Sequence, residues 1–181
     1  TISSNFFFLF FIGIIISCNI IYFFMIEQII NYFTIETIYF WLNLGVLPFW
    51  LILIFFPHSH ICKIFTTSVF PIIMFSSIYC YLFYLILLDD YNFINNFNLY
   101  KSFDELINLV NQQNFLILFW VHFLAINLFC GSWIVKDNQK YNVSKIIIFF
   151  PLIVTYLIGP LGIFIYWIIK IFSAKKITLY D

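Results

Sequence analysis

Arginine is absent from this 181-residue chain, and charge of either sign is scarce, since only 9% of the residues are charged and eight lysines balance eight acidic residues. A soluble domain carries roughly 25% charged residues, so this composition cannot supply a water-exposed surface. There is also no basic stripe, which argues against nucleic-acid binding. The four cysteines, at positions 18, 62, 80 and 130, have no CxxC spacing, and three of them lie in apolar runs where cysteine behaves as a small hydrophobe.

Long apolar runs fill the space that charge leaves. Hydrophobic residues make up 64% of the chain, and the mean hydropathy is +1.04. A bilayer core of about 30 Å is crossed by a helix of about 20 apolar residues. Five runs approach or exceed that length, at 6–25, 38–56, 65–88, 115–135 and 146–169. The sequence therefore predicts an all-α membrane protein, with a four-helix transmembrane core, an additional N-terminal transmembrane helix and the lipid bilayer as its surroundings.

The segments between the runs complete the predicted architecture. In the connection 89–113, apolar residues recur at spacings of three and four from Phe103 to Val110, and Ser102 with Glu105 fits a capping box, which together indicate a short amphipathic helix. Residues 136–145 are expected to form a polar loop. We expect one membrane domain over 1–181, divided into an N-terminal helix and linker (1–36), a helical bundle (37–170) and a tail (171–181), with Lys170 at the boundary of the last two. If all five runs cross, four lysines fall on each side and orientation stays undecided.

The run 115–135 carries two polar side chains, His122 and Asn127, where hydrocarbon is expected. Intramembrane polar groups are functional candidates by default. At about 100° per residue the two lie about 140° apart, so they should face different neighbours. One stripe is Trp120, Asn127 and Gly131, and the other contains His122. His122 is read either as a hydrogen-bonding group to a neighbouring helix, or as an acid/base group or an axial ligand to the magnesium of a chlorophyll.

The run 146–169 holds small residues spaced for close contact, Thr155, Gly159 and Gly162, with Pro160 among them. Such a pattern lets a second helix pack against the backbone, or makes a groove for a polyene or lipid chain. Pro160 leaves the carbonyl of Tyr156 without its helical donor, for which His122 or a tyrosine hydroxyl is a candidate. The predicted binding residues for a carotenoid or chlorophyll are therefore His122, Asn127, Trp120, Thr155, Gly159 and Gly162.

Other polar groups give weaker signals. His58 and His60 are two residues apart, but two ligands in a short loop make a poor metal site, and no metal is expected. The adjacent acids Asp89 and Asp90 are typical of a solvated loop. No nucleophile elbow, phosphate loop or dinucleotide fingerprint is present.

Taken in order, several motifs resemble the ABA-deficient, neoxanthin-synthase-like family of small polytopic membrane proteins. The resemblance covers about residues 38–170 and depends on LPFW (47–50), FDELINLV (103–110), FWVHFLAINLFCGSWIVKD (119–137) and GPLGIFIY (159–166). Two positions depart from the family pattern as we expect it, since Asn127 replaces an acid and Ser132 replaces an arginine.

The resemblance implies a multi-pass plastid membrane protein, in the thylakoid or inner envelope, that handles xanthophylls on the branch from violaxanthin to neoxanthin, as enzyme or accessory factor. An enzyme of this kind would perform an intramolecular isomerisation, with His122 as its catalytic acid/base candidate. The alternative is a non-catalytic subunit of a large, photosynthetic membrane complex, which packs against partner subunits and binds chlorophyll, carotenoid or lipid.

Overall fold

The computed structural model describes residues 32, 34–88, 97, 100–141 and 144–174. Within these ranges the regular elements are all helices. The chain divides into two units, one ending at Phe40 and one running from Trp41 to Asp181, and the architecture below is that of the second. The N-terminal span predicted at residues 6–25 lies outside the described residues.

Among the described residues, three helical segments are long and apolar enough to cross a membrane. They are α2 (Ile35–Phe55), the segment Cys62–Leu88 with η1 (Cys62–Thr66) and α3 (Phe70–Leu88), and α5 (Gln113–Tyr141). Their outer faces expose large apolar side chains such as Leu51, Ile73 and Phe119. Because water would disfavour this much exposed apolar surface, lipid is its natural surrounding. The protein is therefore an integral membrane protein, as the composition predicts.

Prolines follow the end of α2 and mark the beginning of α3. Helix α2 continues through Pro48 and ends just before Pro57. A short π-helix, η1, precedes α3, which begins one residue before Pro71. Proline fits the first turn of a helix because the N–H groups there have no intrahelical acceptor.

The predicted amphipathic helix is confirmed as α4 (Phe103–Val110). The Ser102 side chain accepts a hydrogen bond from the backbone N–H of Glu105 at 3.3 Å, as a helix cap should. Leu109 is buried, and α4 contacts α5.

Helix α5 is longer than the apolar run predicted. It continues through Tyr141, so most of the stretch expected to be a polar loop (136–145) is helical. The reason is tertiary, because Asp137 and Gln139 both bond to residues of other elements, at Lys170 and Pro57. The helical conformation of the last turns of α5 thus places these polar side chains against their partners in other segments.

The last apolar run is divided instead of forming one span. Helix α6 (Lys145–Leu157) and helix α7 (Gly159–Ala174) meet at Ile158, whose φ of −143° and ψ of 88° are not helical. Pro160 lacks the N–H that would continue the helix and disfavours a helical conformation in the residue before it. At 1.5 Å per residue, the 13 residues of α6 cover about 20 Å and the 16 residues of α7 cover about 24 Å. Both helices are therefore shorter than a bilayer core, which is about 30 Å thick.

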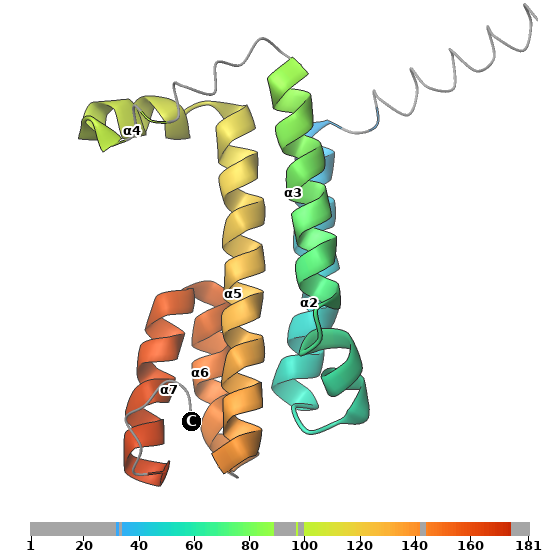
Figure 1. The fold of residues 1–181 in the computed structure, drawn as a ribbon, viewed down its shortest axis with the longest axis vertical. Helices are drawn as coiled ribbons and strands as arrows, with labels where there is room; N and C mark the ends of the chain where they lie inside the picture. The colour runs from blue at the N-terminus through green and yellow to red at the C-terminus, as the bar shows by residue number, and fades with distance from the viewer. Residues whose placement is uncertain (1–31, 33, 89–96, 98–99, 142–143, 175–181) are drawn as a thin grey trace, which may run out of the picture. The chain divides into compact units, whose positions relative to one another are not determined.

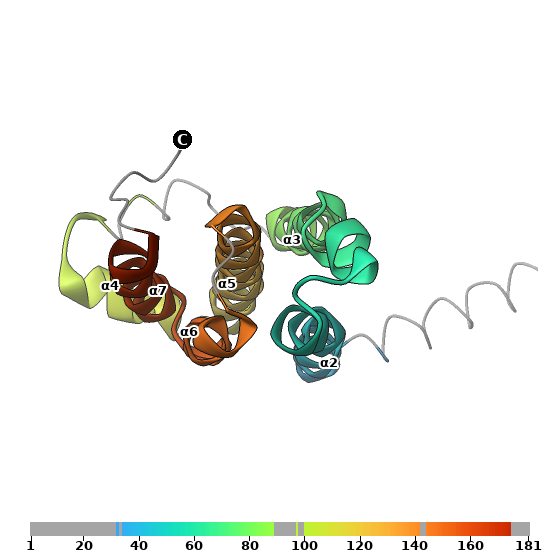
Figure 2. The same cartoon turned by 90° about the horizontal axis from the view of Figure 1, so that it is seen from below.

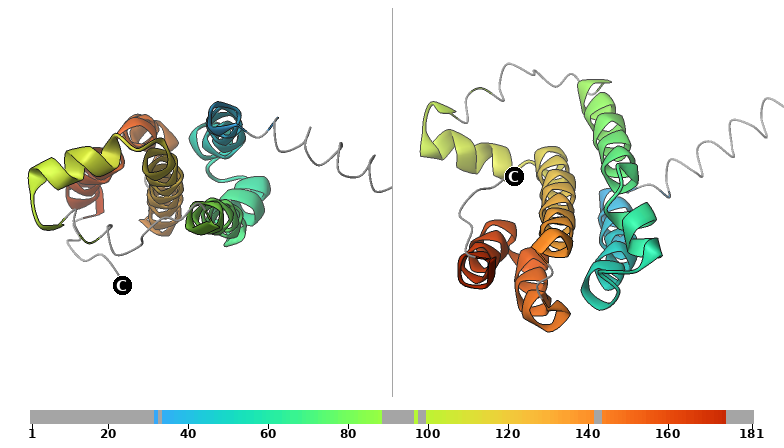
Figure 3. Two further views of the ribbon diagram at one scale, coloured as in Figure 1. Left: turned by 90° about the horizontal axis from the view of Figure 1, so that it is seen from above. Right: turned by 60° about the horizontal axis from the view of Figure 1, so that its bottom comes forward.

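Helix α5 is the central element of this unit, and Figure 1 shows α6 and α7 as a hairpin beside its C-terminal half. Seen along α5, in Figure 2, α3 and α7 lie on opposite sides of it, and α2 and α6 lie toward its other face. Figure 3 gives the same arrangement from above and shows α4 beside the start of α5. None of the described helices covers the face of α5 that lies between α3 and α7.

Candidate functional site

The covered face of α5 carries the stripe predicted from Trp120 to Gly131. Trp120 donates its indole N–H to Asn43 Oδ1 of α2 at 3.3 Å. One side of Gly131 is filled by Trp50 of α2, since a Cβ on this glycine would lie 2.7 Å from the indole ring. These contacts fix α2 against α5 through one hydrogen bond and one backbone-to-ring contact.

Asn127 lies on the same stripe and faces the break between α6 and α7. Its side chain is almost fully buried, and Nδ2 donates to the Tyr156 carbonyl at 3.5 Å. This carbonyl is the one left without a donor by Pro160, so the expectation that His122 or a tyrosine hydroxyl would supply it is wrong. Gly159 faces the Asn127 carboxamide so closely that a Cβ would overlap it.

Thr155 and Gly162 form the second close contact of the hairpin. The Thr155 hydroxyl donates to the Pro151 carbonyl at 2.7 Å, and Thr155 is fully buried. A Cβ on Gly162 would overlap both the side chain and the backbone of Thr155. The predicted groove of small residues is therefore occupied by the chain itself, while ligand contact at these residues stays a prediction.

His122 is separate from that cluster and lies on the uncovered face of α5. It lines a cavity of about 500 Å³ between α3 and α5, together with Phe75, Ser76, Tyr79, Ala125 and Phe129 among others. The side chain is exposed, and no hydrogen bond to it is found among the described residues. Thus His122 and Asn127 do face different neighbours, as their spacing predicts, and the structure does not bring His122 to Thr155, Gly159 or Gly162.

A second apolar cavity, of about 430 Å³, shares the lining residue Phe129 with the first. It lies between α5 and α7 and is lined mainly by aromatic side chains. Its lining residues are Phe129, Cys130, Trp133, Pro160, Ile163, Phe164 and Trp167. The indole nitrogen of Trp167 is buried without a hydrogen-bond partner in the described part of the chain. We call the two cavities together, from His122 to Trp167, the α5 trough.

A buried charged cluster closes the C-terminal end of α5 against α7. Lys170 Nζ lies 3.1 and 3.0 Å from the two carboxylate oxygens of Asp137, and the Tyr166 hydroxyl donates to the same carboxylate at 2.8 Å. Lys170 is only 1% exposed and lies 4.7 Å from the centre of the Tyr141 ring. Trp133 packs edge-on against Tyr166, so the cluster also supports one wall of the trough.

Sequence reasoning missed this cluster by assigning Asp137 to a loop and Lys170 to the boundary with the tail. A signal was available, because Asp137 is the one acidic residue between Asp104–Glu105 and the final residue. Tyr166 and Lys170 are four residues apart and therefore share a helix face. In a membrane protein, charged groups are expected to pair with one another. Asp137, which has no other acid nearby, is therefore expected to pair with Lys170 and the hydroxyl of Tyr166.

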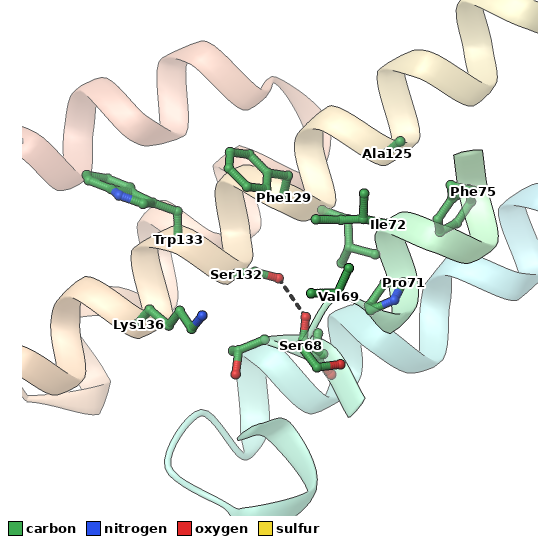
Figure 4. Close-up of a pocket in the computed structure, with 13 residues that line it drawn as sticks. Ser68, Val69, Pro71, Ile72, Phe75, Ala125, Phe129, Ser132, Trp133 and Lys136 are labelled. Atoms are coloured by element: carbon green, nitrogen blue, oxygen red, sulfur yellow. Dashed lines mark hydrogen bonds between the residues drawn. The ribbon is translucent and has the colours of Figure 1, made fainter. Parts of the chain in front are cut away.

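The junction of η1 and α3 contributes polar groups near the same end of α5. Ser132 Oγ donates to the Thr66 carbonyl at 2.9 Å, which links α5 to the end of η1 (Figure 4). In the preceding turn, burial and the nearby Lys145 charge lower the pKa of His58 below its ordinary value, in that order of size.

Comparison with known proteins agrees with the motif pattern. No curated protein and no solved structure matches the chain. The model of the ABA4-like family, described as ABA DEFICIENT 4-like, matches residues 37–166. That interval begins in α2, includes all of α5 and ends in α7 at Tyr166. Because the match covers well over half of the sequence, this membrane protein belongs to the ABA DEFICIENT 4-like family.

Proposed function

We propose that this protein binds a xanthophyll carotenoid in the α5 trough and takes part in its isomerisation toward the neoxanthin type. Family membership supports a carotenoid-related role. The observation that carries the proposal is the pair of cavities that form the trough, whose α5 lining residues extend from Val121 to Trp133, or about 18 Å at 1.5 Å per residue. Its walls are apolar and aromatic, as suits an elongated polyene.

The polar groups of the trough are few and lie toward its two ends. His122 lies in the cavity beside α3, and the unpartnered indole N–H of Trp167 belongs to the cavity beside α7. A xanthophyll has the matching pattern, with an apolar polyene between oxygen-bearing rings. Trp167 would orient one ring by a hydrogen bond to oxygen, and His122 would lie beside the other.

The isomerisation is redox-neutral and requires only proton movement. One epoxide C–O bond breaks, one proton leaves the neighbouring polyene carbon to form the allene, and one proton reaches the epoxide oxygen to give a hydroxyl. An imidazole can both accept and donate a proton. The titratable side chains that line the trough cavity beside α3 are His122, Tyr79 and Cys80, and of these only His122 is an imidazole.

Conversion of violaxanthin by the purified protein tests this function. Wild-type protein in lipid nanodiscs is expected to yield neoxanthin, and His122→Gln is expected to bind violaxanthin without converting it. Binding without conversion by the wild type would reduce the role to that of an accessory carotenoid-binding protein. Absence of carotenoid binding, with chlorophyll found in its place after isolation from native membranes, would favour a subunit of a photosynthetic complex.

A further inference from the structure

The structure contains a third cavity, of about 310 Å³, at the junction of η1 and α3 (Figure 4). We propose that this cavity, which we call the α3 entry cavity, binds a phosphate group, as carried by an anionic membrane lipid. It is lined by Thr66, Thr67, Ser68, Val69 and Pro71 of the turn, by Ile72, Phe75, Ala125, Leu128 and Phe129, and by Ser132, Trp133 and Lys136. The proposal goes beyond carotenoid binding and uses neither His122 nor Trp167.

The cation of the site is Lys136, on the turn of α5 that follows Ser132. Figure 4 shows its side chain reaching toward the hydroxyl-bearing turn that contains Ser68. Lys136 is exposed, and no ion pair to it is found among the described residues, whereas Lys170 is paired with Asp137. A lysine ammonium that lines a cavity in a largely apolar protein supplies a charge for an anion.

A buried hydroxyl in the same cavity lacks a partner. Thr66 is 1% exposed, and its Oγ1 has no hydrogen-bond partner in the described ranges. Its neighbours are occupied, because the Thr67 hydroxyl donates to the Lys63 carbonyl and the Ser132 hydroxyl to the Thr66 carbonyl. A buried polar group without a partner destabilises the fold, so a ligand oxygen that bonds to Thr66 would remove that cost.

The beginning of α3 adds positive electrostatic potential. This helix has 19 residues, and Pro71 in its first turn has no N–H. The Phe70 N–H donates to Ser68 Oγ at 3.2 Å and the Ile73 N–H to the Val69 carbonyl at 3.0 Å, which leaves the Ile72 N–H without an acceptor among the described residues. The macrodipole places a partial positive charge at this end, which favours phosphate. Lys136, the Thr66 hydroxyl and the helix terminus are thus three independent donors around one cavity.

The position of the cavity along the spans fits a lipid headgroup. It lies at the start of the membrane-length segment Cys62–Leu88 and near the C-terminal end of α5. Lipid phosphates lie at this depth, just outside the hydrocarbon core. Ile72, Phe75 and Phe129 form apolar walls toward the trough, against which an acyl chain would pack.

Retention of lipid by the purified full-length protein tests the proposal. The protein is reconstituted in nanodiscs of phosphatidylcholine with phosphatidylglycerol, released into detergent and analysed by native mass spectrometry. We expect one phosphatidylglycerol to be retained, with at least a tenfold lower apparent affinity in Lys136→Gln and a several-fold loss in Thr66→Val. Lys101→Gln, at an exposed lysine far along the chain from the cavity, is the control and should behave as the wild type.

Inorganic phosphate, added alone during release, distinguishes the two sources of the phosphate group. Displacement of phosphatidylglycerol by millimolar phosphate would mean that the site binds the free anion, and resistance to it would mean that the acyl chains contribute. Either result supports the proposal, provided that Lys136→Gln lowers the retention of phosphatidylglycerol. Equal retention of phosphatidylcholine and phosphatidylglycerol, or unchanged retention in both variants, would overturn it.

Discussion

At the scale of single residues, the buried pair of Asp137 and Lys170 is the contact with the largest expected effect on stability. Lys170 is 1% and Asp137 9% exposed, so removal of one partner leaves a charge in a poorly solvated place. Breaking a buried pair typically costs 3–5 kcal/mol, whereas replacing both members with apolar residues is often neutral.

We therefore expect Asp137→Leu to lower the free energy of unfolding in detergent by about 3–5 kcal/mol. Lys170→Met should have a similar effect, and the double variant should recover most of the loss. Thermal unfolding followed by circular dichroism measures each of them, with Lys101→Met as a control at an exposed lysine. Additive effects of the two substitutions would contradict a coupled pair.

At the scale of elements, the α6–α7 hairpin depends on two glycines that face side chains. A Cβ on Gly162 would overlap Thr155, including its backbone, and a Cβ on Gly159 would overlap Asn127. Backbone cannot move aside as a flexible side chain can, so even one methyl group must separate the two helices.

Gly162→Ala is expected to destabilise the protein by about 1–3 kcal/mol through overpacking. Gly45→Ala is the matched control, because no atom of the described chain outside its own helix lies within 4 Å of that Cβ position. This control should be neutral or stabilising, by up to about 1 kcal/mol, since alanine is the better helix former. Melting temperatures of the two variants measure the difference, and equal values would show that the close approach does not matter.

Sequence patterns were sufficient for the elements whose cause is local. The lengths of the apolar runs predict α2, α3 and α5 as spans, and the capping box at Ser102 predicts the start of α4. The break at Ile158 was missed because proline and glycine are tolerated inside membrane helices when neighbours supply the missing hydrogen bonds. Whether the run continues or turns back depends on Asn127, which is far away in sequence and donates to the freed Tyr156 carbonyl.

The candidate site was predicted in part for the same reason. Helical spacing is enough to separate the faces of His122 and Asn127, and it also places His122 on one stripe with Ala125 and Phe129, which line the same cavity. It does not reveal that the stripe lies open between α3 and α7. The pairing of Asp137 with Lys170 joins residues 33 positions apart, and only the return of α7 alongside α5 brings them together.

At the scale of the whole second unit, the returning hairpin changes the distribution of charge. Because α6 and α7 turn back, Lys170 pairs with Asp137, the residue after Lys136, and therefore lies at the same end of α5 as Lys136. Lys63 and Lys145 belong to this end too, since Gln139 bonds to Pro57 and Lys145 acts on His58. The equal division of lysines, four on each side, that five crossing runs would give therefore does not hold. By the positive-inside rule, the end of α5 that carries more lysines is expected on the side of the membrane from which the protein inserts.

Orientation is measured by labelling single cysteines, after replacement of the native cysteines, in intact bacterial cells that express the protein. A membrane-impermeant thiol reagent added outside should label Lys101→Cys and leave Lys140→Cys unlabelled until the cells are opened. Both positions are exposed, so the difference reports the side of the membrane and not burial. The reverse pattern would contradict the assigned orientation.

The central claim is that the α5 trough holds a xanthophyll, and quenching of tryptophan fluorescence tests it most directly. Trp133 and Trp167 line the trough, so a bound polyene should quench their emission in a saturable titration of the purified protein. Ala125→Phe, which fills the cavity beside His122, should raise the carotenoid concentration needed for half-maximal quenching at least tenfold. Leu51→Phe, on the exposed face of α2, should leave that concentration unchanged. Saturable quenching of equal strength in the wild type and in Ala125→Phe, or no saturable quenching at all, would contradict the account.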